Sequence, residues 1–136
     1  MKTIIIDFEF EDLDAGGVVH HPNYIKLCER ARNRWLAEFG ITFNNLKIID
    51  IALAIRSIKA DYLRPISQES INIKMSVTAH TEKSLTILHQ FFPHSSQNKA
   101  PHFSAEITLV AANYSTGKSC SLPLDVKYFL QQNQKI

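Results

Sequence analysis

The stretch that decides the fold is DLDAGGVVHHPNYIKLCERARNRWLAEFGI, residues 12–41. Its second half predicts a helix from Pro22 to Phe39, because apolar residues recur there at steps of three and four. Pro22 is typical of a first helical turn, and Gly40 is typical of the position just past a helix end. The predicted buried stripe consists of Tyr24, Leu27, Cys28, Ala31, Trp35 and Phe39, while the polar residues, which fall mostly between them, are Lys26, Glu29, Arg30, Arg32, Asn33 and Arg34.

On both sides of this helix the hydrophobic period changes to two, which predicts strands. The first ten residues place Ile4, Ile6, Phe8 and Phe10 on one face of a strand. Beyond the helix, the predicted strands are residues 51–63, 70–80, 84–92, 102–114 and 119–124, and the one longer loop between them is 93–101. Joints this short require antiparallel pairing, because parallel strands need long crossover connections. The pattern predicts an α+β fold, with an antiparallel sheet of five to six strands and one long helix, in a single domain over residues 1–136.

Several predicted strands are apolar on both faces. Leu88 and Val110 are opposite in phase to Leu85 and Leu109. One helix cannot cover both faces of a sheet, and a large exposed apolar patch is a liability in a single chain. We therefore expect a homodimer at least.

Composition narrows the classes of function. The chain has 136 residues, of which 45% are hydrophobic and 21% are charged, and these values are ordinary for one globular domain. The net charge is only +2 and no basic block occurs, so nucleic acid is not the expected partner. The apolar run near the N-terminus, three isoleucines, is too short for a signal peptide or a membrane span. We expect a cytoplasmic protein with no membrane span.

The two cysteines, Cys28 and Cys120, have no metal-like spacing. A single disulfide between them is one alternative, but reduced thiols are expected in a cytoplasmic protein. Cys28 falls inside the predicted helix, away from the helix start that would lower its pKa. It is therefore interpreted as a small packed side chain and not as a nucleophile.

The histidines do not predict a metal site. His20 and His21 are adjacent in sequence, and adjacent side chains rarely point at one ion, even with Asp12 and Asp14 close by. The histidines of the predicted strands and of the long loop are expected at the surface: His80, His89, His94 and His102.

The first half of the opening stretch carries groups that suit carbonyl chemistry. The pair Gly16-Gly17 permits a tight turn, and the helix start near His21 offers unpaired N–H groups and the positive end of the helix dipole. Asp14 lies upstream and, folded back, would add a nucleophile or base to this oxyanion-type site. The simpler alternative is that Asp12 or Asp14 caps a turn.

The order of these residues resembles the signature of the hotdog-fold acyl-CoA thioesterases of the 4-hydroxybenzoyl-CoA thioesterase type, a group that includes bacterial thioesterases associated with the Tol-Pal system. A second stretch, DYLRPISQESINI (61–73), is similar to the strand-turn-strand segment of that family. The positions that match the first signature are Asp12, Asp14, Gly17, Val18, Val19, His21, Asn23, Tyr24, Glu29, Arg30, Ala31, Arg32 and Gly40.

This resemblance implies a sheet wrapped around a central helix, paired into a homodimer and often into a dimer-of-dimers tetramer, with active sites at the dimer interface. It implies that Asp14 is the catalytic carboxylate, which attacks the thioester carbonyl or activates the water that does so. The backbone N–H at His21 would polarise the carbonyl oxygen, and the His21 side chain would orient the thioester or assist proton transfer. The implied substrate-binding positions are Gly17, Val18, Val19, His20, Asn23 and Tyr24.

No metal or prosthetic group is required by this reading. Coenzyme A or a phosphopantetheine arm belongs to the substrate, an acyl-CoA or an acyl-carrier protein. Two positions depart from the family pattern: His20 stands where the family usually has Tyr or Trp, and Leu13 replaces a small residue. Both departures are expected to affect acyl preference and not the chemistry.

Two alternatives to hydrolysis stay open. One is a hotdog module that binds an acyl thioester without cleaving it, and the other is a hydratase or dehydratase of the same fold. Asp14 favours the enzyme, because a binding module has no need of a carboxylate aimed at the helix start. The characteristic Asp/His motif of the hydratases does not occur.

Overall fold

The computed structural model describes residues 1–7, 21–67, 70–94 and 100–133, with only the backbone described at His21. In chain order the elements are β1 (Lys2–Ile6), α1 (His21–Ala37), α2 (Phe43–Ile48), β2 (Ile51–Tyr62), β3 (Ile71–His80), β4 (Ser84–Pro93), β5 (Phe103–Asn113) and α3 (Leu124–Gln132).

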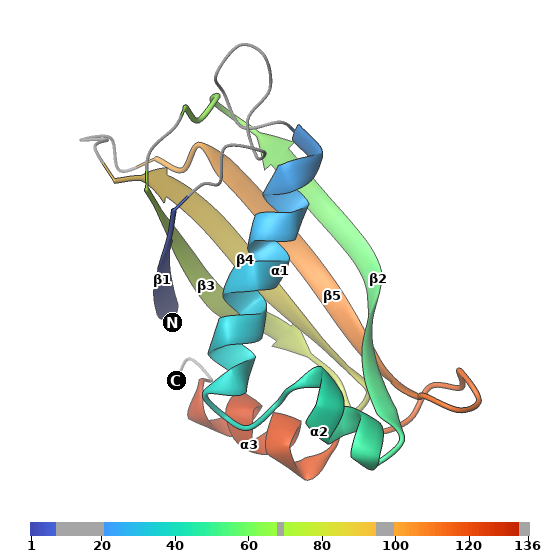
Figure 1. The fold of residues 1–136 in the computed structure, drawn as a ribbon. Helices are drawn as coiled ribbons and strands as arrows, with labels where there is room; N and C mark the ends of the chain where they lie inside the picture. Colours follow the sequence, from blue (N-terminus) through green and yellow to red (C-terminus); the bar gives the residue numbers. More distant parts are fainter. Residues whose placement is uncertain (8–20, 68–69, 95–99, 134–136) are drawn as a thin grey trace.

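The five strands form one sheet in the order β1-β3-β4-β5-β2. Every neighbouring pair is antiparallel. Figure 1 shows α1 lying along one face of this sheet, with α2 and α3 near the end of α1 that is remote from its start. The predicted α+β class and the antiparallel sheet are thus confirmed.

The face of the sheet that carries α1 holds the core. Alternate residues of the three middle strands are buried there, as the period of two predicts. Leu85 and Leu109 are buried, whereas Leu88 and Val110, on the opposite face, are half-buried. The core residues of these strands are Ile71, Ile73, Met75, Leu85, Ile87, Phe91, Phe103, Ala105, Ile107, Leu109 and Ala111.

The end of α1 has the expected geometry. Gly40 has a φ of +74°, in the left-handed region that favours glycine. The N–H of Gly40 donates to Ala37 O at 3.0 Å, and the N–H of Ile41 donates to Leu36 O at 3.1 Å. These two bonds form a Schellman motif, and Ile41 is buried beside it at 3% exposure. The chain leaves α1 at a fixed angle and enters α2.

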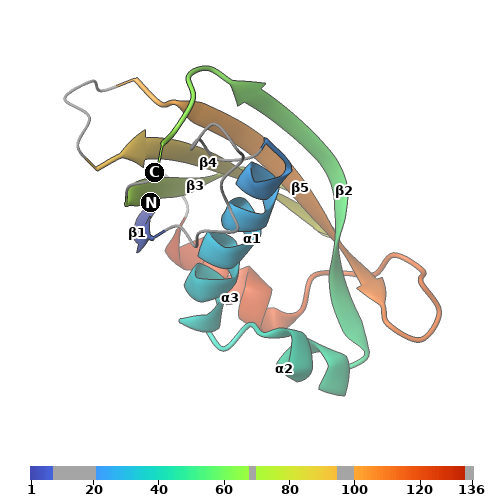
Figure 2. The same ribbon diagram turned by 45° about the horizontal axis from the view of Figure 1, so that its top comes forward.

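Strand β2 contains a bulge. Its register against β5 shifts between Ile55 and Ser57, so that Ile55 pairs with Leu109 and Ile58 pairs with Ile107. Both isoleucines therefore face the helix side, although they are three residues apart. A bulge bends its strand and increases the local twist, and β2 curves strongly in Figure 2.

Two helices were not predicted from the sequence, and one predicted strand is wrong. Residues 119–124 form no strand, since only Ser119 makes an isolated bridge, to Ala112. Helix α3 begins at Leu124 and buries Val126, Phe129 and Leu130. The short α2 begins after Thr42, whose Oγ1 accepts a hydrogen bond from the N–H of Asn45 at 3.1 Å.

No helix in the described part of the chain is both long and apolar enough to cross a membrane.

Candidate active site

Most of the predicted catalytic segment lies outside the described residues. This applies to Asp12, Asp14, Gly16, Gly17, Val18, Val19 and His20, and to the side chain of His21. The structure does place the backbone of His21 at the first position of α1. It also describes Asn23 and Tyr24, the two predicted substrate-binding residues inside the helix.

Tyr24 packs in an aromatic cluster beneath the start of α1. Its exposed fraction is 4%, and its ring lies 4.7 Å from that of Phe103 and 5.2 Å from that of Tyr62. A third ring, that of Phe91, stacks on Tyr24 at 5.8 Å. Asn23 beside it is also buried. The aromatic cluster therefore fixes the position of the helix start against β2, β4 and β5.

Cys28 is a packed side chain, as the sequence predicts. It is fully buried, and burial raises the pKa of its thiol to about 12, against a smaller opposing effect of the Arg32 charge. The thiolate is the nucleophilic form of cysteine, and this thiol stays protonated at neutral pH. Cys28 and Cys120 are both free thiols.

The structure contains a buried pair of basic residues that the sequence analysis did not predict. Arg32 on α1 is 4% exposed and His89 on β4 is 0% exposed, and Arg32 Nη1 lies 3.4 Å from His89 Nε2. The other imidazole nitrogen, Nδ1, lies 3.4 Å from Ala105 O. The expectation of a surface histidine is wrong for His89, whereas His80 and His94 are exposed and His102 is half-buried.

The sequence contained a signal for both residues. His89 has the same phase in β4 as Leu85, Ile87 and Phe91, so the period of two places it on the core face. Arg32 follows Cys28 by four residues, which places it beside the buried stripe of α1. The prediction relied on residue type and not on position in the strand or helix, since charged and polar residues are mostly exposed.

Burial and mutual repulsion determine the charges of this pair. Burial, together with a smaller effect of the neighbouring Arg32 charge, lowers the pKa of His89 to about 3. The imidazole is therefore neutral at pH 7. Burial also lowers the pKa of Arg32, while Glu29 acts in the opposite direction, and a guanidinium keeps its proton in proteins. The result is a buried positive charge whose hydrogen-bond partner is neutral.

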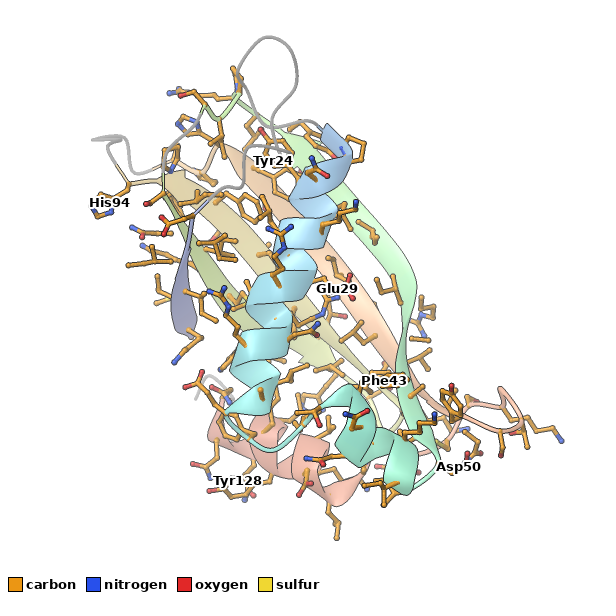
Figure 3. The ribbon with its side chains drawn as sticks, in the orientation of Figure 1. Tyr24, Glu29, Phe43, Asp50, His94 and Tyr128 are labelled. Carbon is orange, nitrogen blue, oxygen red and sulfur yellow. The ribbon has the colours of Figure 1, made fainter. Side chains whose placement is uncertain are left out.

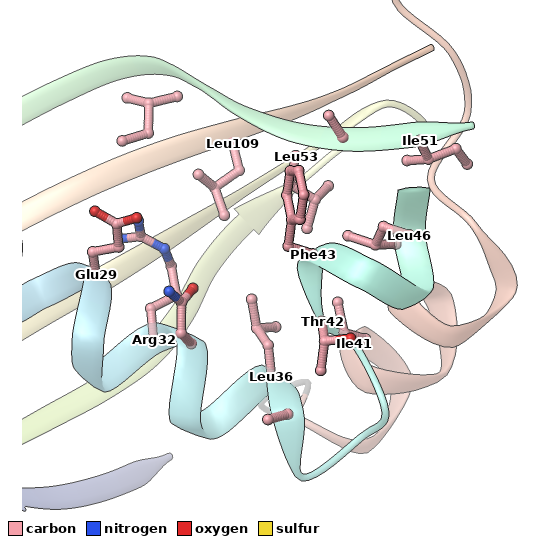
Figure 4. Close-up of a pocket in the computed structure, with 14 residues that line it drawn as sticks. Glu29, Arg32, Leu36, Ile41, Thr42, Phe43, Leu46, Ile51, Leu53 and Leu109 are labelled. Carbon is pink, nitrogen blue, oxygen red and sulfur yellow. The ribbon is translucent and has the colours of Figure 1, made fainter. Parts of the chain in front are cut away.

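Arg32 lines a cavity of about 500 Å³ between α1, α2, β2 and β5. Figure 4 shows Glu29 and Arg32 at one end and the side chains of α2 and of the start of β2 at the other. Most of the wall is apolar, formed by Leu36, Ala37, Ile41, Phe43, Leu46, Ile51, Ala52, Leu53, Ile55 and Leu109. In Figure 3, Tyr24 lies in the first turn of α1 and Phe43 lies on α2, beyond the other end of α1, so the cavity lies away from the aromatic cluster. An elongated apolar group with one polar end would match this wall.

A metal centre is not found among the described residues, where no group of three or more His, Cys, Asp or Glu side chains could hold an ion.

The fold and sequence together define the class of the protein. The family model of the thioesterase-like superfamily matches residues 8–130, which include the segment of Asp14, all of α1 and the whole sheet except β1. The chain therefore belongs to the thioesterase-like superfamily.

Individual relatives agree with this assignment. The chain is 28% identical over 120 residues to the acyl-CoA thioesterase YbgC of Helicobacter pylori, over 84% of this chain and 88% of the relative. A solved gentisyl-coenzyme A thioesterase superposes with a TM-score of 0.80 at 25% identity, and the match covers 93% of this chain and 98% of that one. A Staphylococcus aureus protein solved in complex with CoA superposes with a TM-score of 0.87, covering 98% and 85%; at 16% identity this match supports the fold alone.

Proposed function

We propose that this protein hydrolyses acyl thioesters, releasing a free acid and a thiol, and that its substrates are acyl-CoA or acyl-carrier-protein thioesters. The observation that carries the proposal is the family match over residues 8–130. In addition, a relative named as an acyl-CoA thioesterase aligns with 84% of this chain. The cavity beside α1 adds support, because a mostly apolar wall suits an acyl group.

In the proposed mechanism, Asp14 supplies the attacking group. Either its carboxylate attacks the thioester carbonyl and water then cleaves the resulting anhydride, or it removes a proton from the water that attacks. Both routes form a tetrahedral oxyanion, the C–S bond breaks, and the thiolate leaves and takes up a proton. The N–H at the start of α1, at His21, stabilises the oxyanion together with the helix dipole. No metal or prosthetic group takes part.

The remaining segment positions are assigned supporting roles. We assign substrate binding to Gly17, Val18, Val19, His20, Asn23 and Tyr24, and Tyr24 also holds the first turn of α1 in place. The side chain of His21 orients the thioester or assists proton transfer. These assignments follow the family pattern and the packing of Tyr24.

A homodimer, or a tetramer of two such dimers, is part of the proposal, with the active sites at the dimer interface. Strand β2 is a long edge strand in the sheet order, and such an edge presents unpaired N–H and C=O groups. Ile55, Ile58 and Tyr62 face the helix side yet are 46%, 41% and 51% exposed. A second copy of the chain would cover this flank.

The experiment is a free-thiol release assay with a panel of acyl-CoA and acyl-carrier-protein thioesters. Wild-type protein is expected to hydrolyse members of the panel, and Asp14→Asn to lose at least roughly a hundredfold in rate, as expected for a group that acts on the reacting bond. Asp12→Asn is the matched control, since it removes a carboxylate from the same segment and should leave most of the activity.

Two results would contradict the proposal. Binding of acyl-CoA without release of thiol from any thioester would indicate the alternative, a non-catalytic acyl-thioester-binding module. An Asp14→Asn variant with the wild-type rate would show that Asp14 is not the catalytic carboxylate.

A further inference from the structure

The cavity between α1, α2, β2 and β5 combines a mostly apolar wall with one buried positive charge. Arg32 is 4% exposed and has five N–H donors. In the part of the chain that the structure describes, its hydrogen-bond contact is a single long one, 3.4 Å to His89 Nε2. No carboxylate among those residues forms an ion pair with it.

A buried charge in this situation is costly unless a counter-charge or several hydrogen bonds compensate it. His89 offers neither, since the same burial and the Arg32 charge keep the imidazole neutral. Glu29 lies at the same end of the cavity and its charge favours the protonated guanidinium, but its side chain is exposed and forms no ion pair with Arg32, so it compensates the buried charge only in part. An anionic group that enters the cavity would provide the missing charge.

We propose that this cavity is a binding site for apolar monocarboxylic acids, with the carboxylate on the Arg32 guanidinium and the hydrocarbon body against Leu36, Leu53 and Leu109. The guanidinium fork matches the two oxygens of a carboxylate. The cavity volume of about 500 Å³ suits an aryl or medium-length alkyl body. Acids of this class are what thioester hydrolysis releases, so the site would hold the product; that last link rests on the proposed function, whereas the binding itself does not.

The test measures equilibrium binding by isothermal titration calorimetry, without any thioester. The probes are 4-phenylbutanoate and 4-phenylbutanamide, which share an apolar body and differ in charge. Wild-type protein should bind the acid at least about tenfold more tightly than the amide, the scale of a hydrogen bond to a charged group. Arg32→Gln should bind both probes equally, and Arg56→Gln, which removes an exposed cation from β2, should keep the wild-type preference.

Glu29→Gln provides a second and opposite readout at an exposed position. Removing this carboxylate removes a repulsion, so the acid should bind about two- to fivefold more tightly while binding of the amide is unchanged. The Glu29→Gln measurement tests the proposal even if the Arg32→Gln variant fails to fold. Leu53→Trp, which fills the cavity from β2, should weaken binding of both probes.

Equal affinity of the wild type for acid and amide, or no binding of either, would overturn the proposal. So would weaker binding of the acid by Glu29→Gln, which would mean that the ligand donates a hydrogen bond to Glu29. A protein that binds the acid as described but releases no thiol from any thioester would retain this site and lose the proposed function.

Discussion

The indole of Trp35 on α1 meets the ring of Phe129 on α3 edge-on, with their centroids 4.7 Å apart and their planes at 70°. Phe39 contacts the same phenylalanine at 5.1 Å. Phe129 is fully buried, and Trp35 is 2% exposed. This three-ring contact attaches α3 to the end of α1.

Phe129→Ala is therefore expected to lower the free energy of unfolding by about 3–5 kcal/mol, the usual cost of removing a buried ring and leaving a cavity. Tyr128→Ala is the control from the same helix, since Tyr128 is 55% exposed and its loss should cost less than about 1 kcal/mol. Chemical denaturation of both variants measures the difference. Equal losses would mean that α3 is not held by the core.

The depressed pKa of His89 predicts that stability falls in mild acid. The imidazole has a pKa of about 3 in the folded protein against 6.5 in the unfolded chain, so between these values the unfolded state binds more protons. Its contribution to stability is complete above pH 6.5 and is lost as the pH falls toward 3. One such group changes the free energy of unfolding by at most about 1.4 kcal/mol per pH unit.

Denaturation of wild type and His89→Gln at several pH values from 7 to 4 tests this, and the variant should show the smaller loss on acidification. His94→Gln is the matched control, because His94 is exposed and its removal should leave the wild-type slope. Parallel slopes for wild type and His89→Gln would show that His89 does not cause the acid sensitivity.

The two thiols should react differently with a thiol reagent such as Ellman's reagent. Cys28 is buried and has a pKa of about 12, so in the native protein it should not react, whereas the half-buried Cys120 should react slowly. We expect one titratable thiol per native chain and two after denaturation. Cys120→Ser should abolish the native signal and Cys28→Ala should leave it unchanged; a signal that follows Cys28 instead would contradict its assignment as a packed side chain.

The uncovered flank of β2 can be tested through the oligomeric state. Light scattering should give a multiple of the chain mass of 15.5 kDa for the wild type. Ile58→Lys places a charge on the flank and should shift the mass toward one chain, since a charge buried without a partner disfavours association. Ile5→Lys does the same on β1 at the other sheet edge and should not change the mass; a monomeric wild type would contradict the proposed dimer.

The sequence predicted the parts of the fold that follow from local periodicity. Helix α1, the end of the helix at Gly40 and the pairing of β3, β4 and β5 are all confirmed. Helix α3 was not predicted, because the burial of its apolar face depends on the contact of Phe129 with Trp35, which is far away in sequence. Residues 119–124 have an alternating pattern but no neighbouring strand to pair with beyond Ser119.

The candidate site was predicted less completely. Asp14 and the glycine pair could be singled out by motif, and they stay predictions. Arg32 and His89 could not be recognised as partners, because they come from different elements and only the packing of α1 on β4 brings them together. The burial of Arg32 also goes against the usual preference of arginine, which is mostly exposed.

The strand order also has a consequence for the order in which the strands can pair during synthesis. Strand β1 is synthesised before the other strands, but its Lys2 pairs with Met75 in β3. The sheet is complete only when Asn113 in β5 can pair with Ile51 in β2. At a synthesis rate of roughly 5–20 residues per second, Ile4 and Ile6 are synthesised several seconds before the residues of β3 with which they pair. Such long-range pairing slows folding, whereas the β3–β4–β5 meander is local and can form early. The nascent chain thus emerges with its first strand unpaired, and we expect the β3–β4–β5 meander to form before the two edge strands, β1 and β2, pair with it.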